Sequence, residues 1–171
     1  MGDHDSPPGC IVMMDRRTVQ KLALIRRRLS ADPSRIVAGR LHEGCAEAES
    51  GVAEWDQVLA ILNGGNCGVF DLWSTEELAG NQFYSATMPG AREEWLVIGQ
   101  LTYEPIAVNR RTGRMVCFPA DGPSLELGDI RHFVADFLFG ERYKEVVADV
   151  EQDPWWQLLK EVNRVIDQSE W

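Results

Sequence analysis

Apolar residues recur every three or four positions in the first third of the chain, a spacing that puts them on one face of an amphipathic helix. One such stripe, at residues 15–29, predicts a helix that ends before Pro33, because proline cannot continue the hydrogen bonding of a helix. A second stripe, at residues 55–62, predicts another helix. The small and acidic stretch between them, residues 42–51, is expected to be a loop.

The glycine-rich stretch NGGNCG follows the second stripe and raises the question of a phosphate-binding loop. Such a loop follows a strand and opens a helix, whereas these glycines follow a helix. We therefore interpret Gly64 or Gly65 as the left-handed residue that closes the second helix. Residues 69–73 then alternate as in a strand, and Ser74 and Glu77 have the spacing of a capping box at the start of a short helix.

The middle of the chain is strand-like. We predict strands at residues 95–100, 105–109 and 114–118. Gly113 stands where a hairpin turn between the last two strands needs a left-handed residue.

The last third returns to helical spacing. Stripes at residues 130–138 and 143–150 predict two helices with Gly140 between them. Asp153 and Pro154 form a start signal for a final helix, since aspartate caps helices and proline is tolerated in the first turn.

Length and composition set the number of domains. At 171 residues and 44% hydrophobic, the chain can bury one substantial core and is short for two domains. We expect a loose extension at residues 1–14 and a single domain at residues 15–171. No apolar run approaches the roughly 20 residues that span a bilayer, and the acidic, proline-containing start is unlike a secretory signal. A cytoplasmic protein is expected.

The net charge of −10 is unevenly distributed. Residues 1–40, the basic head, hold eight Lys and Arg against four Asp and Glu. This leaves nine of the 17 basic and 23 of the 27 acidic residues to residues 41–171, the acidic body. An acidic body repels nucleic acid and attracts basic proteins by speeding and orienting their encounter. An acidic surface that only maintains solubility is the alternative. The basic head has no interleaved aromatic residue for base stacking, so we expect no nucleic-acid partner.

The spacing of the cysteines and histidines does not indicate a metal site or a catalytic site. The four cysteines form no close pair and the three histidines are equally scattered, whereas zinc sites use closely spaced ligands. We therefore expect no metal, cofactor or disulfide framework. The best arrangement for catalysis is Cys67 with His42 or His132, but the sequence around Cys67 matches no nucleophile motif. A small buried cysteine is the simpler interpretation, and the chain is predicted not to be an enzyme.

Four blocks of the sequence, taken in order, resemble the SUKH superfamily of fungal cell-wall regulators and bacterial immunity proteins. They are LNGG, GVFDLWSTEEL, WLVIGQLTYEPIAVNRRTGRMVCF and DIRHFVADFL, all within about residues 52–138. The resemblance implies an α+β fold in which one curved, mostly antiparallel sheet is flanked by helices. It also implies a protein that works by binding, because the immunity members block toxin domains, often nucleases. An acidic body suits that role, since a nuclease presents basic residues to phosphate.

The middle of the chain departs from the family pattern. Ile98 and Gly99 are followed by QLTYE where many members have a glycine- and acid-rich segment, and Asn109 stands where they have aspartate. If this segment belongs to a recognition surface, the partner differs from those of closer relatives.

These observations predict a protein-binding module, most simply an immunity protein that neutralises a basic, nuclease-type toxin domain. A regulatory or scaffold protein of the same fold, bound to an endogenous partner, is the alternative. Tyrosine and tryptophan anchor interfaces, whereas acidic residues steer them or lie at their rims. An ordinary surface or packing role is the alternative for each candidate contact, and no membrane partner or oligomeric state is predicted. The candidate contacts, all expected to be exposed, are Asp71, Trp73, Tyr103 and Glu104.

Overall fold

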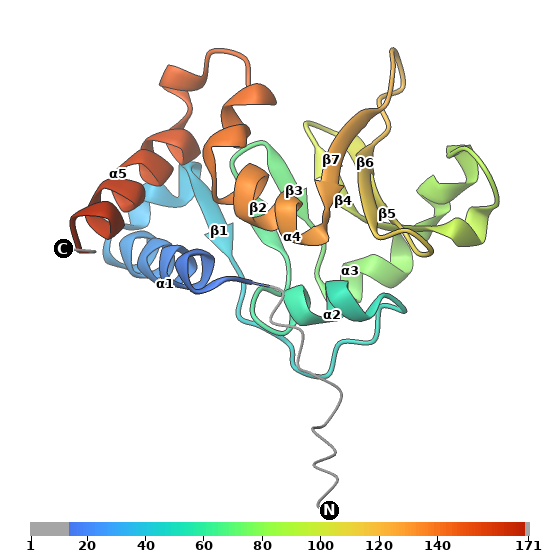
Figure 1. Ribbon diagram of the computed structural model, residues 1–171, viewed down its shortest axis with the longest axis horizontal. Helices are drawn as coiled ribbons and strands as arrows, with labels where there is room; N and C mark the ends of the chain where they lie inside the picture. Colours follow the sequence, from blue (N-terminus) through green and yellow to red (C-terminus); the bar gives the residue numbers. More distant parts are fainter. Residues whose placement is uncertain (1–13, 170–171) are drawn as a thin grey trace, which may run out of the picture.

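One sheet of seven antiparallel strands runs through the molecule (Figure 1), and the computed structural model describes residues 14–169. The strands pair in the order in which they occur in the chain, so each lies beside its sequence neighbours. With helices packed on the sheet, the chain has the single α+β fold that was predicted. The strands are β1 (Gly39–Leu41), β2 (Gly65–Cys67), β3 (Phe70–Leu72), β4 (Trp95–Leu101), β5 (Glu104–Asn109), β6 (Arg114–Cys117) and β7 (Leu125–Asp129).

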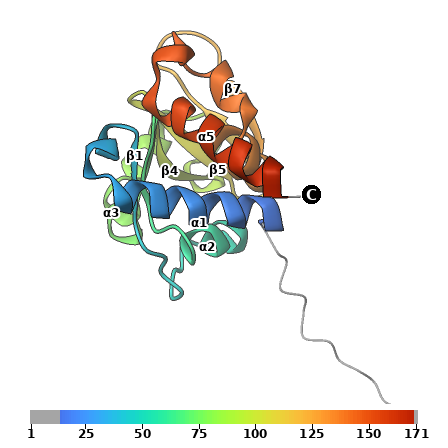
Figure 2. The same ribbon diagram turned by 90° about the vertical axis from the view of Figure 1, so that its left-hand side faces the viewer.

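The two long helices enclose one side of the sheet. Figure 2 shows α1 (Arg16–Ala31) and α5 (Pro154–Ser169) side by side, and ion pairs such as Arg28 with Glu161 join them. Asp153 is the predicted cap of α5 and accepts from the Trp156 amide, and Asp15 caps α1 in the same way by accepting from the Thr18 amide. The shorter helices are α2 (Ala53–Leu59), α3 (Thr75–Gly80) and α4 (Ile130–His132), which continues as a π-helix, η4 (Phe133–Leu138). Short 3-10 segments complete the chain: η1 (Pro33–Val37), η2 (Gln82–Thr87), η3 (Arg92–Glu94), η5 (Glu141–Glu145) and η6 (Val150–Gln152).

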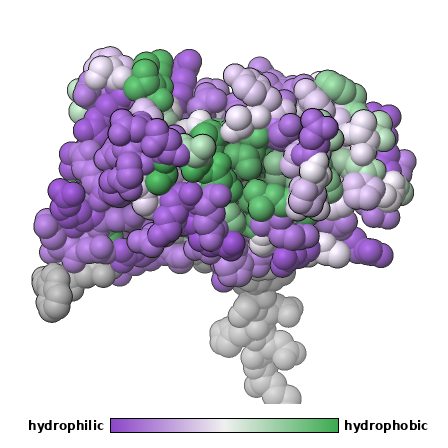
Figure 3. All heavy atoms as spheres, turned by 90° about the horizontal axis from the view of Figure 1, so that it is seen from above, coloured by the Kyte–Doolittle hydropathy of each residue, from purple (hydrophilic) through white to green (hydrophobic). Residues whose placement is uncertain are grey.

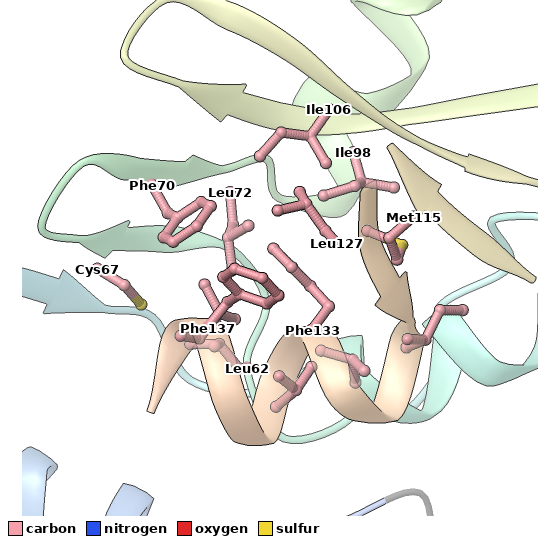
Figure 4. Packing of buried hydrophobic residues seen from close by; sticks show 14 of the residues in the cluster. Leu62, Cys67, Phe70, Leu72, Ile98, Ile106, Met115, Leu127, Phe133 and Phe137 are labelled. Carbon is pink, nitrogen blue, oxygen red and sulfur yellow. The ribbon is translucent and has the colours of Figure 1, made fainter. Parts of the chain in front are cut away.

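The inner face of the sheet, which carries Phe70, Leu72 and Ile106, packs against η4 (Figure 4). The Phe70 and Phe133 rings meet edge to face with their centroids 5.4 Å apart, an arrangement that aromatic pairs prefer. Phe137 follows one helical turn later and is also buried. The predicted apolar stripe at residues 130–138 is therefore core.

The outer face is covered only in part. Segment 82–94 packs on β4, where the Gln82 side chain bonds the backbone N–H and carbonyl of Val97 at 3.0 and 2.9 Å. The indole N–H of Trp95 donates to the Pro89 carbonyl at 2.7 Å. Farther along the same face, the side chains of Arg40 and Asn66 on β1 and β2 are exposed. The outer face of the first strands is thus accessible.

Gly64 and Gly65 have the left-handed conformation that was predicted, but they do not have the predicted role of closing a helix. Helix α2 ends at Leu59, so neither Gly64 nor Gly65 closes it, although both have positive φ. Both glycines instead permit close strand packing, because a Cβ on Gly65 would lie 2.1 Å from the Arg40 carbonyl oxygen. The residues after them form the β2–β3 hairpin, and the predicted capping box of Ser74 and Glu77 opens α3.

Two further predictions need correction. Residues 143–150 form the end of η5, a turn and the first residue of η6 instead of one helix, because the chain reverses here, with Asp149 in a left-handed conformation. Met14 is buried, so the packed domain begins one residue before the predicted boundary, while residues 1–13 lie outside the described part. Across residues 14–169, no helix has both the length and the apolar character required to cross a bilayer.

Candidate functional site

The β4–β5 turn presents the most conspicuous side chain of the predicted contacts. Leu101 pairs with Glu104, so the turn consists of Thr102 and Tyr103, with φ of +46° and +71°. Positive φ at both central residues is the pattern of a type I′ turn, which favours asparagine and glycine. A β-branched residue such as threonine is especially unfavourable there. The Tyr103 side chain is 87% exposed, so packing does not explain its presence.

This turn is one of three that share the same end of the sheet, which we call the hairpin end: residues 68–69, 102–103 and 118–124. The Thr102 amide donates to the Val69 carbonyl at 3.0 Å, and the Val69 amide donates to the Tyr143 hydroxyl at 3.0 Å. The first bond joins two of the three turns, and the second anchors residues 68–69 to η5. Figure 3 views the molecule from above and shows hydrophobic residues gathered in a hollow with hydrophilic residues around it. An apolar centre with a polar rim is typical of protein interfaces.

Glu104 has a structural contact at the hairpin end. Its Oε2 accepts a hydrogen bond from the Ala120 amide at 3.0 Å. The half-buried carboxylate thus fastens the β6–β7 loop to β5. Its predicted role in partner binding stays a prediction.

Trp73 was expected to be exposed, and this expectation is wrong. Only 6% of the residue is exposed, because its ring stacks on Tyr84 with centroids 5.7 Å apart. Tyr84 in turn stacks on Phe83 at 4.3 Å, and it is Phe83 that reaches the solvent. Sequence reasoning missed Phe83 and Tyr84 because η2 is too short to show a periodic pattern. The adjacent aromatic pair in NQFYS was the available signal.

Asp71 belongs to a polar row on the outer face, together with Arg40, Asn66 and Gln100. Each residue of the row is the register partner of the next, from β1 to β4. Asn66 Nδ2 donates to Asp71 Oδ1 at 3.0 Å, and Gln100 Nε2 donates to the Tyr84 hydroxyl at 3.4 Å. Burial raises the pKa of Asp71, and the charge of Glu77 adds to this rise, against the opposing effects of Asn66 and His42. The row is a preorganised polar surface with a partly desolvated carboxyl group.

Negative charge is concentrated in the segment that contains this row. Residues 41–91 hold eight acidic residues and no Lys or Arg. None of the eight forms an ion pair with another residue in the 14–169 range. The basic residues of the head are instead compensated by α5: Arg17 pairs with Asp167, and Arg28 and Arg35 both pair with Glu161. The eight are Glu43, Glu47, Glu49, Glu54, Asp56, Asp71, Glu76 and Glu77.

The structure gives no support to Cys67 as a nucleophile. Cys67 is fully buried, and burial raises the pKa of its thiol well above the usual range. A reactive cysteine needs the opposite shift and access to substrate. His132 is exposed as the last residue of the three-residue α4, and its Nδ1 lies 2.8 Å from Oδ1 of Asp129, the residue that caps this helix. In the described part of the chain, no three His, Cys, Asp or Glu side chains are placed to hold a metal ion.

No protein-family model matches the chain, and no curated protein or solved structure is significantly similar to it.

Proposed function

We propose that this chain is a non-catalytic protein-binding module and that its hairpin end contacts the partner through Tyr103. The observation that carries the proposal is an exposed tyrosine in a turn whose backbone favours asparagine and glycine. Backbone strain is concentrated at functional sites, and tyrosine is among the residues that dominate binding energies. A turn selected for folding alone would gain nothing from this side chain.

The proposed partner is a basic toxin domain of the nuclease type, which the chain neutralises as an immunity protein. Two observations support this partner. The acidic residues of segment 41–91 form no ion pair among the described residues, so they can attract a basic surface. The sequence blocks that resemble the SUKH superfamily include β3, β4 and β5, and therefore the Tyr103 turn.

The first experiment captures the partner with the tagged full chain from a lysate of its own source and identifies it by mass spectrometry. The captured domain is then purified, and its Kd for the chain is measured at several salt concentrations. We expect a basic domain whose binding weakens with salt and whose toxic activity stops when the chain is added. A partner whose activity the chain leaves unchanged contradicts the immunity role and favours a regulatory or scaffold protein.

Tyr103→Gly tests the interface. It removes the ring and suits the turn, so we expect binding to weaken by at least about thirtyfold, or roughly 2 kcal/mol, without loss of stability. Phe83→Ala is the matched control, since Phe83 is also an exposed aromatic residue but lies on η2. Binding that depends on Phe83 and not on Tyr103 would place the interface on the outer face and contradict the proposal.

A pair of charge-reversal variants tests the electrostatic part. The first variant changes three acidic residues of segment 41–91 to lysine, and the control changes three acidic residues elsewhere, so both alter the net charge equally. We expect the first variant to slow association and flatten its salt dependence more than the control does. Equal effects would mean that only net charge matters. The first set is Glu47, Glu49 and Glu76, and the control set, which lies outside the hairpin end, is Glu93, Glu141 and Glu151.

A further inference from the structure

The edge strand β1 has peptide groups that face away from the sheet. The Gly68 amide donates to the Ala38 carbonyl and the His42 amide donates to the Gly64 carbonyl, at 3.1 and 3.2 Å. Bonds to the neighbouring strand alternate along an antiparallel ladder, so the peptide groups of Gly39 and Leu41 point to the free side. Within residues 14–169, no other backbone or side-chain group bonds them there.

A groove of about 450 Å³ runs along this free edge, between β1, the end of α1 and η1. Figure 2 faces the side of the molecule on which α1 lies beside β1. Ile36 is 64% exposed at the groove, so an apolar surface stands open beside the strand edge. The lining includes Arg26, Leu29, Pro33, Ile36, Arg40 and Leu41.

Two arginines make the groove locally cationic in an acidic protein. Arg26 uses Nη2 to donate to the carbonyls of His42 and Ile61, at 2.8 and 2.6 Å, while its buried Nε has no partner among the described residues. Arg40 is exposed at the centre of β1. Neither arginine forms an ion pair with the described residues, and Glu43 is the one carboxylate in the groove lining. An acidic group in the groove would therefore be attracted.

The opposite edge of the sheet is less suited to pairing. The β6–β7 register shifts between Arg114 and Val116, and Gly128 has a φ of +77°. Such irregularities blunt an edge strand against addition of another strand.

We propose that an extended peptide in which apolar and acidic side chains alternate binds beside β1 as an eighth strand. Its backbone would pair with the outward groups of Gly39 and Leu41, as in β-strand addition. Successive side chains of a strand point to opposite faces. An apolar residue would therefore lie over Gly39 near Ile36, and the next residue, an acidic one, would lie beside Arg40 on the outer face.

A peptide pair tests the charge preference. The probes are fluorescein-labelled six-residue peptides that alternate valine with glutamate or valine with lysine, titrated against the full chain by fluorescence anisotropy. The net charge of −10 favours the lysine peptide, so tighter binding of the glutamate peptide requires a local site. We expect a roughly tenfold preference for glutamate, and Arg40→Glu should reverse it. No binding up to about 1 mM, or an unchanged preference in Arg40→Glu, overturns the proposal.

Two N-methylated glutamate peptides test the backbone pairing. One is methylated on the amides that face one side of the strand and the other on the amides that face the opposite side. Strand addition uses only one side, so we expect one peptide to lose binding and the other to keep it. Loss in both peptides, or in neither, overturns strand addition. This site is separate from the hairpin end, so Tyr103→Gly should still bind the glutamate peptide and the two proposals can fail independently.

Discussion

The two turns of strand β5 follow opposite rules. At its end, the Asn109 Oδ1 accepts hydrogen bonds from the amides of Arg111 and Thr112, both at 3.0 Å, and Gly113 takes the left-handed position with φ of +73°. At its start, Thr102 and Tyr103 hold left-handed positions that their side chains disfavour. The turn that begins at Asn109 has the residues that its backbone requires, whereas the turn of Thr102 and Tyr103 does not.

The difference between the turns separates folding from binding. The Asn109 turn uses a side chain that is buried and whose Oδ1 accepts from two backbone amides. The Tyr103 turn uses a side chain that points into solvent. Because strained backbone conformations cluster at functional sites, a strained turn with an exposed aromatic residue is consistent with the proposed role in binding.

The largest expected effect is a loss of stability when the Asn109 turn is altered. Asn109→Ala removes the acceptor for two backbone amides at a buried position, and we expect a loss of about 2 kcal/mol in the free energy of unfolding. Urea titration monitored by tryptophan fluorescence measures it. Arg111→Ala, at an exposed position of the same turn, is the control and should change the value little. A loss below about 0.5 kcal/mol in Asn109→Ala would show that water replaces this acceptor freely.

Substitutions that suit the Thr102–Tyr103 turn should instead increase the free energy of unfolding. Changing Thr102→Asn and Tyr103→Gly together supplies the residues that a type I′ turn favours, and we expect a gain of about 1–2 kcal/mol in the free energy of unfolding. Thr102→Asn alone, which keeps the ring, should give part of the gain. The same urea titration applies, in parallel with partner binding, which the double variant should lose. A double variant less stable than the parent chain would mean that Tyr103 contributes to folding.

The parts of the fold that sequence predicted are those with long periodic patterns or specific caps. Helices α1 and α5 are both 16 residues long, and α5 begins at the aspartate cap that the sequence predicted. Strands β1 and β2, with three residues each, are too short for alternation to be visible. Gly65 was misinterpreted because the reason for it is the Arg40 carbonyl, which only the folded sheet brings close.

The candidate site was predictable to a similar extent. The exposure of Tyr103 follows from its place between two strands predicted from the sequence, so local reasoning was sufficient. The burial of Trp73 depends on a stacking partner, Tyr84, that lies in an irregular segment. The alignment of Asp71 with Asn66 and Gln100 depends on strand register, which no local pattern in this chain specifies.

The smallest expected effect is a change in the pH dependence of stability, and it comes from Asp71 on the outer face. The pKa of Asp71 is raised chiefly by burial, so the folded protein binds this proton more tightly than the unfolded chain does. The stability that depends on Asp71 therefore falls as pH rises from the ordinary aspartate value of about 3.9 through the folded pKa, and the loss is complete above it. Asp71→Asn removes this loss, while its amide oxygen still accepts from Asn66 Nδ2.

Thermal unfolding between pH 3 and pH 7 tests this effect of Asp71. We expect Asp71→Asn to match the parent chain at the acidic end and to have a higher Tm at neutral pH, whereas the exposed control Asp121→Asn should show no such divergence. A lower Tm for Asp71→Asn at neutral pH would show that the carboxylate stabilises the fold. The higher Tm would instead mean that Asp71, like Tyr103, lowers stability on an accessible surface, as expected of residues kept for binding.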